Sequence, residues 1–351
     1  DLDHDYFFLI YPKLQATYTL SDHAFWPDMW ETARIRFAYG ESGEPPPPGE
    51  SLVTWRTVSA DENTLVYQIN NGGNKKIGPE ITREWEVGLD GSFFLGRVNY
   101  TATAYKRETI DGLVYVWPPS SNGLEEQYLR NLGNWDARGF ETALDFLVYD
   151  NIDVQVNLNG RYQWNRTEMG QLSNDPTDDY YVGSDQRYKP GVVMPAFLDY
   201  KLVNADSIGQ QPVYSDTREV YGPSYPPHEA SAGLGLTLWN RLNFDTFFLA
   251  NWGHYLTDIQ ASYMVQDDVG WPTQLCVDIV AADLAYDEGN TDAFAGFKTS
   301  DIAKCTRGYR EDWASPADFI RLGTVSASYR LPETWLQAIP GGFQQATVQL
   351  Q

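Results

Sequence analysis

The sequence contains no run of about 18 apolar residues, the minimum for a membrane-spanning helix, so a helical membrane protein is excluded. The mean hydropathy is low, at −0.45. A β-barrel is compatible with this value, because its strands alternate apolar and polar residues and keep the mean hydropathy low.

Basic residues are scarce. There are 25 Lys and Arg against 48 Asp and Glu, which gives a net charge of −23. No nucleic-acid partner is expected, because no basic patch exists to meet phosphates. An acidic surface suits divalent cations or cation-bridged lipopolysaccharide, and it is equally common as plain solubilising surface.

Cysteine is nearly absent. Cys276 and Cys305 lie in one long stretch with weak strand signal. Two cysteines in one loop of an extracytoplasmic protein usually pair, so we expect a disulfide, with two unrelated thiols as the alternative. Neither their spacing nor their neighbours indicate a zinc site.

Catalytic motifs are also missing: there is no nucleophile elbow, glycine-rich phosphate loop or metalloprotease helix, so we expect no enzyme and no cofactor. A glycosidase would need a pair of carboxylates, but with 48 Asp and Glu such pairs are expected by chance. Calcium could bind an acidic loop that lacks EF-hand spacing, and a solvated acidic loop is the alternative. The residues of that loop are Asp283, Asp287, Glu288, Asn290 and Asp292.

Aromatic residues, in contrast, are abundant, with 12 Trp, 23 Tyr and 16 Phe. They favour strands, and in a barrel they form girdles at the two membrane interfaces. The clearest strand is 152–165, where one face is apolar and ends in Tyr162 and Trp164, while the other face is polar throughout. This alternation is longer than an ordinary strand and suits a tilted strand that crosses a membrane.

The same alternation recurs along the chain and predicts about twelve strands. The segments that show it are 13–21, 33–40, 80–91, 93–106, 138–149, 152–165, 228–239, 241–252, 318–331 and 342–351. Tight turns are expected at 89–92, 149–151 and 239–241, and long irregular connections at 41–78, 107–135, 166–227 and 258–316, with a helical turn or two near 278–290. Alternating short and long connections are typical of an outer-membrane barrel.

Five blocks of this sequence resemble the SusC/RagA group of TonB-dependent outer-membrane receptors. They are YPKLQATYTLSDHAFWPD with ARIRFAYGESGEPPP, then PEITREWEVGLD at 79–90, AYKRETIDGL at 104–113, NLG with ARGFE at 131–141, and DFIRL through SYRLP at 318–332. The blocks follow the family's order and span nearly the whole chain. Ala137 and Gly112 depart from the residues that are usual at those positions.

The resemblance implies an all-β fold: an antiparallel transmembrane β-barrel segment with long extracellular loops, about twelve strands of a barrel of about 22. Residues 1–351 would form part of the barrel without a plug domain, cut at both ends. The implied function is TonB-dependent import of an oligosaccharide or peptide across the bacterial outer membrane. The implied partners are the TonB–ExbB–ExbD complex, acting through the missing plug, a SusD-like surface lipoprotein, membrane lipid and lipopolysaccharide.

Aromatic residues in the long connections are the candidates for ligand contact, because sugar faces stack on such rings. They are Trp117, Tyr128, Trp135, Tyr180, Tyr181, Tyr188, Tyr221, Tyr225 and Trp271. Packing between loops is the alternative for each. The rival functions are a passive porin or structural barrel, and a secreted β-rich carbohydrate-binding or fibre protein.

Overall fold

The computed structural model describes residues 9–59, 64–116, 127–170, 180–181, 186–267, 269–307, 309–336 and 345–350. The chain divides into two compact units. The first, which we call the sheet unit, comprises residues 1–178, 228–251 and 319–351. The second, the loop unit, comprises 179–227 and 252–318. Each unit is described by itself.

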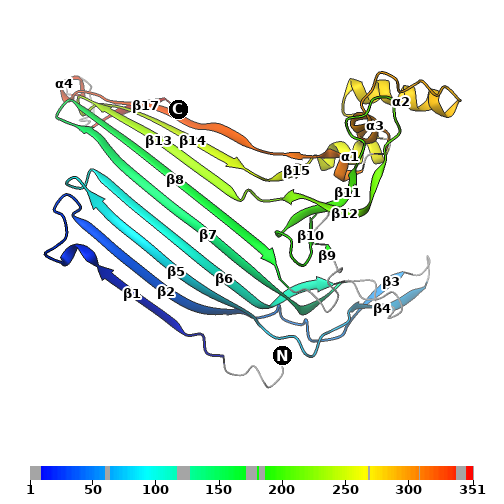
Figure 1. The fold of residues 1–351 in the computed structure, drawn as a ribbon, viewed down its shortest axis with the longest axis horizontal. Helices are drawn as coiled ribbons and strands as arrows, with labels where there is room; N and C mark the ends of the chain where they lie inside the picture. Colours follow the sequence, from blue (N-terminus) through cyan, green and yellow to red (C-terminus); the bar gives the residue numbers. More distant parts are fainter. Residues whose placement is uncertain are drawn as a thin grey trace. The chain divides into compact units, whose positions relative to one another are not determined.

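The sheet unit is built on one antiparallel sheet of ten strands, in the order β1-β2-β5-β6-β7-β8-β13-β14-β17-β18 (Figure 1). The strands are β1 (Lys13–Thr19), β2 (Thr32–Glu44), β5 (Glu80–Phe93), β6 (Val98–Val116), β7 (Tyr128–Asp150), β8 (Val154–Met169), β13 (His228–Leu238), β14 (Leu242–Trp252), β17 (Phe319–Arg330) and β18 (Thr347–Leu350). Each of the ten segments with alternating residues overlaps one of these strands. The antiparallel fold class is therefore confirmed, with ten strands in this sheet where about twelve were predicted.

Short connections at 94–97, 151–153 and 239–241 join strands at one end of the sheet, and long connections at 45–79, 170–227 and 253–318 leave from the other end. At the short end, Trp239 and Asn240 both adopt positive φ, of 50° and 53°, as the tight β13–β14 turn requires. The turn predicted at 89–92 is wrong, because those residues continue β5 and the chain turns at 94–97. Asp90 of this stretch forms an ion pair with Arg36 of the neighbouring strand β2. Gly91 has no side chain, which leaves room for the ring of Tyr100.

The two faces of the sheet differ in polarity across adjacent strands. Val87, Ala104, Phe140 and Trp164 are paired in register and form one row of the apolar face. The strand pattern predicted for 152–165 is confirmed from Val154 onward. Apolar side chains on this face stay open to the surroundings: Val87, Leu144 and Leu158 are 54%, 47% and 43% exposed.

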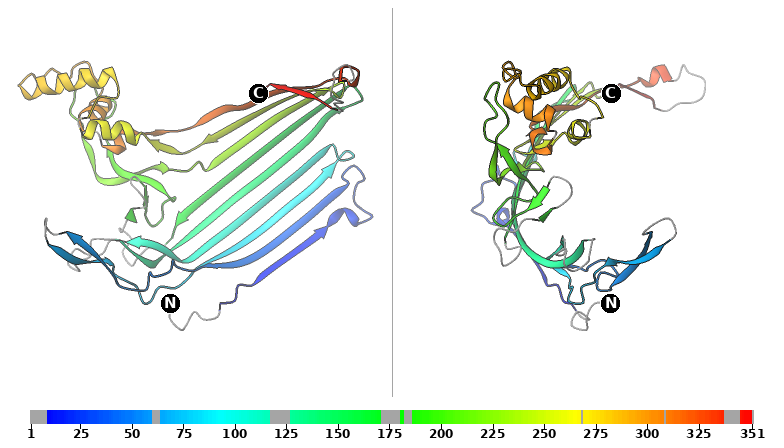
Figure 2. Two further views of the ribbon diagram at one scale, coloured as in Figure 1. Left: turned by 180° about the vertical axis from the view of Figure 1, so that it is seen from behind. Right: turned by 90° about the vertical axis from the view of Figure 1, so that its right-hand side faces the viewer.

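The long connection predicted at 107–135 is wrong at both of its ends. Residues up to Val116 extend β6, and residues from Tyr128 onward belong to β7 (Figure 2). The prediction failed because charged residues such as Glu108 and Asp136, which face each other on adjacent strands, interrupt the apolar face there. Cross-strand ion pairs replace apolar contacts in that part of the sheet.

A hairpin and two short helices also belong to the sheet unit. A hairpin of β3 (Thr54–Ser59) and β4 (Leu65–Asn71) lies within the β2–β5 connection. The short helix α4 (Glu333–Leu336) follows β17, and the 3-10 helix η2 (Leu20–Asp22) follows β1. No helix in the described ranges is both long and apolar enough to cross a membrane.

The loop unit contains regular structure where irregular connections were predicted at 166–227 and 258–316. A four-stranded sheet has the order β12-β11-β10-β9, and β15 pairs with β16. The strands are β9 (Tyr180–Tyr181), β10 (Gln186–Tyr188), β11 (Ala196–Leu202), β12 (Tyr214–Pro223), β15 (Tyr255–Thr257) and β16 (Ala314–Pro316). The helices are α1 (Ile259–Gln266), α2 (Gln274–Asp287), α3 (Thr299–Thr306) and the 3-10 helix η4 (Arg310–Trp313).

The helices of the loop unit surround a buried cluster. Cys276 of α2 and Cys305 of α3 form a disulfide with an S–S distance of 2.04 Å, so the predicted pairing is present. Ile279, Phe294 and Ile302 pack beside the disulfide and are fully buried. The helix predicted as a turn or two near 278–290 is a complete helix whose first turn is capped by the Thr273 hydroxyl.

Candidate functional site

Ion pairs and hydrogen bonds join neighbouring strands on the polar face of the sheet unit. Arg36 Nε donates to Asp90 Oδ2 over 2.7 Å, and a second guanidinium nitrogen donates to the hydroxyl of Thr103 over 3.2 Å. Arg107 of β6 pairs with Glu84 of β5 toward the end with the long connections. These contacts satisfy charged side chains on a face that, in a barrel, would line a water-filled interior.

The same polar face is hollowed near the end with the long connections. The hollow has a volume of about 510 Å³, and its lining includes Glu80, Glu84, Arg107 and Trp135. The ring of Trp135 lies directly against the backbone of Gly112, where a Cβ would approach a ring carbon to 2.0 Å. Trp135 therefore offers an aromatic surface beside carboxylates and a guanidinium.

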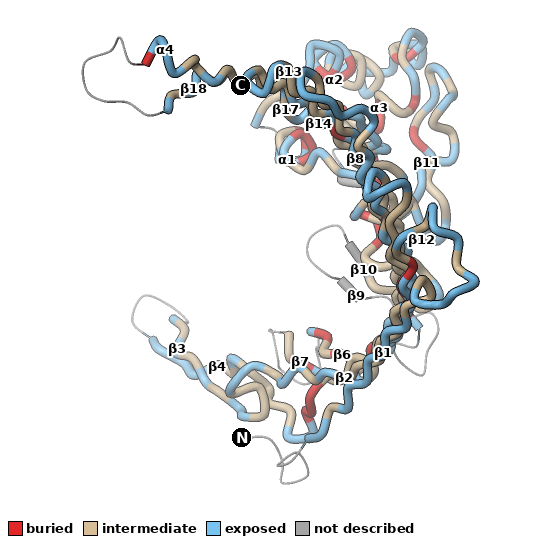
Figure 3. The backbone as a smooth tube through the Cα atoms, turned by 90° about the vertical axis from the view of Figure 1, so that its left-hand side faces the viewer, coloured by how far each residue is buried: buried red, intermediate tan, exposed pale blue. Residues whose placement is uncertain are grey.

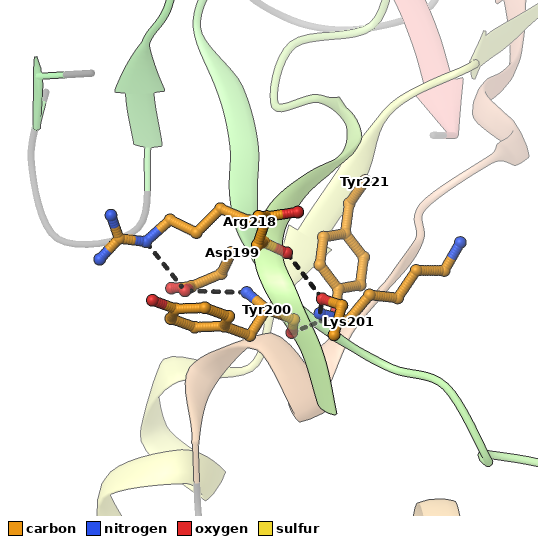
Figure 4. Close-up of polar contacts among 7 residues, drawn as sticks. Asp199, Tyr200, Lys201, Arg218 and Tyr221 are labelled. Carbon is orange, nitrogen blue, oxygen red and sulfur yellow. Dashed lines mark hydrogen bonds and ion pairs between the residues drawn. The ribbon is translucent and has the colours of Figure 1, made fainter. Parts of the chain in front are cut away.

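In the loop unit, β11 and β12 gather five charged and aromatic residues, which we call the Arg218 cluster (Figure 4). Its members are Asp199, Tyr200, Lys201, Arg218 and Tyr221. The guanidinium carbon of Arg218 lies 5.3 Å from the centre of the Tyr200 ring, and its Nε lies 3.5 Å from Asp199 Oδ1. The hydroxyl of Tyr221 donates to the backbone oxygen of Tyr200 over 3.1 Å.

The Arg218 cluster combines the groups that recognise polar ligands. An aromatic ring gives a flat apolar surface on which a sugar face stacks, and guanidinium and carboxylate groups bind hydroxyls, carboxylates or amides. The Lys201 amine lies 3.9 Å from Glu219 Oε2 and is largely exposed. Because the Arg218–Tyr200 contact fixes a guanidinium over a ring, less side-chain entropy is lost when a ligand binds there.

The predicted ligand-contact residues fall in both units. In the sheet unit, Tyr128 and Trp135 are strand residues of β7, and Trp117 lies outside the described residues. In the loop unit, Tyr188 is paired in register with Tyr180, and the backbone of Tyr181 is paired with Arg187. The side chains of Tyr180 and Tyr181 lie outside the described part of the structure.

The other three predicted residues of the loop unit have different surroundings. Tyr221 belongs to the Arg218 cluster and also makes an edge-on contact with Tyr255. Tyr225 follows β12 and is 65% exposed. Trp271 packs against the buried helical cluster around the disulfide. The structure thus joins Tyr221 to a polar cluster and packs the partly buried Trp271 against the helical cluster.

Sequence reasoning missed Asp199, Tyr200, Lys201 and Arg218. All four lie in a region treated as an irregular connection. A signal was present for β11, because apolar and charged residues alternate in the stretch LDYKL, as strand residues do, whereas β12 has a run of polar residues in YSDTREVY and no such alternation. Short strands inside a long connection carry too few residues for this pattern to stand out.

A buried carboxyl group anchors β12 to η4 within the loop unit. The Tyr214 hydroxyl donates to Asp312 Oδ2 over 2.6 Å, and Asp312 is only 9% exposed. Burial raises the pKa of Asp312 to about 6, against the opposing effects of the Tyr214 hydrogen bond and of Arg307 and Lys304. This carboxyl group therefore changes charge just below neutral pH.

The acidic residues of 283–292 lie in the last turns of α2 and in the loop that follows. Burial and the neighbouring carboxylate of Asp287 both raise the pKa of Asp283. Among the residues that the structure describes, no group of three or more His, Cys, Asp or Glu is arranged to hold a metal ion. Calcium binding in this loop stays a prediction.

Comparison with known proteins identifies a family over almost the whole chain. Residues 2–336 match the family model described as "TonB dependent receptor-like, beta-barrel". The "TonB-dependent receptor SusC" of Bacteroides thetaiotaomicron is 28% identical over 118 residues. The "TonB-dependent receptor P26" of Formosa agariphila is 27% identical over 146 residues.

A likeness in fold extends further than the likeness in sequence. The structure titled "Structure of the RagAB peptide transporter" superposes on 97% of this chain with a TM-score of 0.75 at 18% identity. The "open-open" state of the RagAB peptide importer superposes with a TM-score of 0.73. The chain spans 12% and 14% of the lengths of the two receptors and 39% of the first RagAB chain.

Proposed function

The chain belongs to the TonB-dependent receptor-like β-barrel family and lies in the bacterial outer membrane; from this premise we propose that its protein imports a large nutrient, with energy delivered by TonB. The resemblance to the SusC/RagA group is confirmed by the match to SusC and by the RagAB fold. The observation that carries the proposal is the ten-stranded antiparallel sheet with one apolar and one polar face. Such a sheet separates lipid from water and forms a barrel wall.

We propose that the ligand is an oligosaccharide or a peptide, bound partly by the Arg218 cluster. Its rings and charged groups suit ligands that carry both flat apolar faces and many hydrogen-bonding groups. A SusD-like lipoprotein is the proposed partner at the cell surface, and the TonB–ExbB–ExbD complex is the proposed partner in the periplasm. In this proposal the chain supplies barrel wall and outer loops.

The test uses the full-length gene in its native host. Deletion should abolish growth on one class of oligosaccharide or peptide, and an uncoupler of the proton gradient should stop uptake of the labelled ligand. Uptake that persists with the uncoupler would replace the proposal with a passive porin. Growth that is unchanged on every nutrient of both classes would contradict import.

Within the same assay, Arg218→Ala tests the proposed contact. Loss of a charge-assisted hydrogen bond to the ligand should weaken apparent affinity by about tenfold. Asp216→Asn is the matched control, because Asp216 is an exposed residue of the same strand β12 outside the cluster. Equal affinity of the two variants would remove the Arg218 cluster from the binding surface.

A further inference from the structure

A row of three cations crosses the apolar face of the sheet unit. Lys106 of β6 is paired in register with Arg138 of β7, and Arg138 is paired with Arg166 of β8. We call these three residues the cation row. Residues in register across adjacent strands point to the same face, so the three charges lie side by side.

The cation row lies at the edge of the apolar area. Two residues away along each strand, toward the end with short connections, lie Ala104, Phe140 and Trp164, which are also in register. Side chains two residues apart in a strand share a face. The cations therefore share the face that meets lipid and begin where its aromatic residues end.

Strand tilt explains why only part of the row is cationic. The row continues from Lys106 to Trp85 of β5 and then to Tyr39 of β2. Barrel strands tilt by about 35–45°, so a row across the strands changes depth from one strand to the next. Aromatic residues occupy the part of the row at interface depth, and cations occupy the part beyond it.

Three like charges in register repel one another, and the carboxylates of Glu108, Asp136 and Glu168, which are in register two residues farther along the strands, neutralise them only in part. The Lys106 amine lies 3.9 Å from Asp136 Oδ1, and an Arg138 nitrogen lies 3.9 Å from Glu168 Oε2. Only Arg166 makes a short contact, 2.5 Å to Glu168 Oε1. The side chains of Lys106 and Arg138 are 67% and 59% exposed.

We propose that the cation row binds phosphate groups of lipopolysaccharide in the outer leaflet. The long connections mark the outward end of the sheet, so the row lies at the depth of the outer headgroups. Adjacent strands are about 4.8 Å apart, so the row spans about 10 Å, enough for two phosphate groups. Lysine and arginine bind phosphate through charge-assisted hydrogen bonds. The proposal rests on outer-membrane placement and does not depend on import.

The experiment measures lipid retained by the full-length receptor. The wild type and the triple variant Lys106→Gln, Arg138→Gln, Arg166→Gln are purified, and bound lipopolysaccharide is counted by native mass spectrometry after prolonged detergent exchange. The triple variant should retain about tenfold less, because its three phosphate donors are gone. Lys13, Arg34 and Arg161 are exposed, lie on the polar face of the sheet, and supply the control variant Lys13→Gln, Arg34→Gln, Arg161→Gln with the same change in charge.

Equal retention by the wild type and both variants would overturn the proposal. A second measurement needs no variant and decides the matter if the triple variant does not fold. Delipidated wild type is titrated with lipopolysaccharide and with the same lipid after enzymatic removal of its phosphates. We expect affinity to fall about tenfold without the phosphates, and equal affinities would overturn the proposal. Nutrient uptake is measured separately, so a failure of import stays distinct.

Discussion

The sheet unit and the loop unit are stabilised in opposite ways. The sheet unit exposes apolar side chains such as Val87 and Leu158 on one face and has few buried residues for its size (Figure 3). The loop unit buries Ile279, Phe294 and Ile302 around a disulfide. Exposure of an apolar face of this extent to water would be unfavourable, whereas a buried apolar core is stable in water.

The difference teaches that the two units fold in different solvents. In lipid, the backbone must satisfy its own hydrogen bonds, and the ten-stranded ladder does so along the strands. In water, a small unit with a modest core gains from a covalent cross-link. Changes to the disulfide should therefore affect only the loop unit, and changes to the apolar face only the sheet unit.

The largest effect is expected from Cys276→Ser combined with Cys305→Ser. The disulfide closes a loop with a sequence separation of 29, so its loss should destabilise the loop unit by about 3–4 kcal/mol. Hydrogen exchange of α2 and α3 should accelerate while exchange in β5–β8 stays unchanged. Faster exchange in the sheet strands as well would show that the units are not independent.

A charge on the apolar face should act on the sheet unit alone. Leu158→Arg places a cation toward lipid and should cost about 2–4 kcal/mol in folding free energy, measured by urea titration in lipid vesicles. Asn159→Arg is the control, because Asn159 is the next residue of β8 and points to the polar face. If both variants lost equal stability, the apolar face would not meet lipid.

A smaller, pH-dependent effect is expected at Asp312. Because its pKa is raised to about 6 from a usual value near 3.8, the folded loop unit favours the protonated carboxyl group, and stability should fall as pH rises from 4 to 6. Asp312→Asn imitates the protonated form and can still accept from Tyr214. The variant should be more stable than the wild type at pH 7.5 by on the order of 2 kcal/mol, and equal to it at pH 4.

Hydrogen exchange of the segments that contain Tyr214 and Trp313 measures this difference. The sheet strands serve as the internal reference, since Asp312 belongs to the loop unit. A wild type whose loop-unit exchange is the same at pH 4 and pH 7.5, after correction for the intrinsic rate, would contradict the prediction.

The strands of the sheet could be predicted because one face of each is apolar over many residues, as in Val154–Trp164. The ends of β6 and β7 could not, since Glu108 and Asp136 break the pattern where the strands leave the apolar layer. The Arg218 cluster was missed for a related reason. β11 and β12 are short, and the pairing of one with the other depends on tertiary contacts that a local sequence pattern does not show.

The sequence by itself determined the period-two alternation, the alternating short and long connections, the two cysteines and the family. These are local properties, because alternation, turn residues and motif blocks are read from neighbouring positions. Tertiary structure alone decided the register that places Lys106, Arg138 and Arg166 side by side, the burial that raises the pKa of Asp312, and the packing of Trp271 against the helical core. Each of these depends on distances between residues far apart in the chain, which local sequence does not encode.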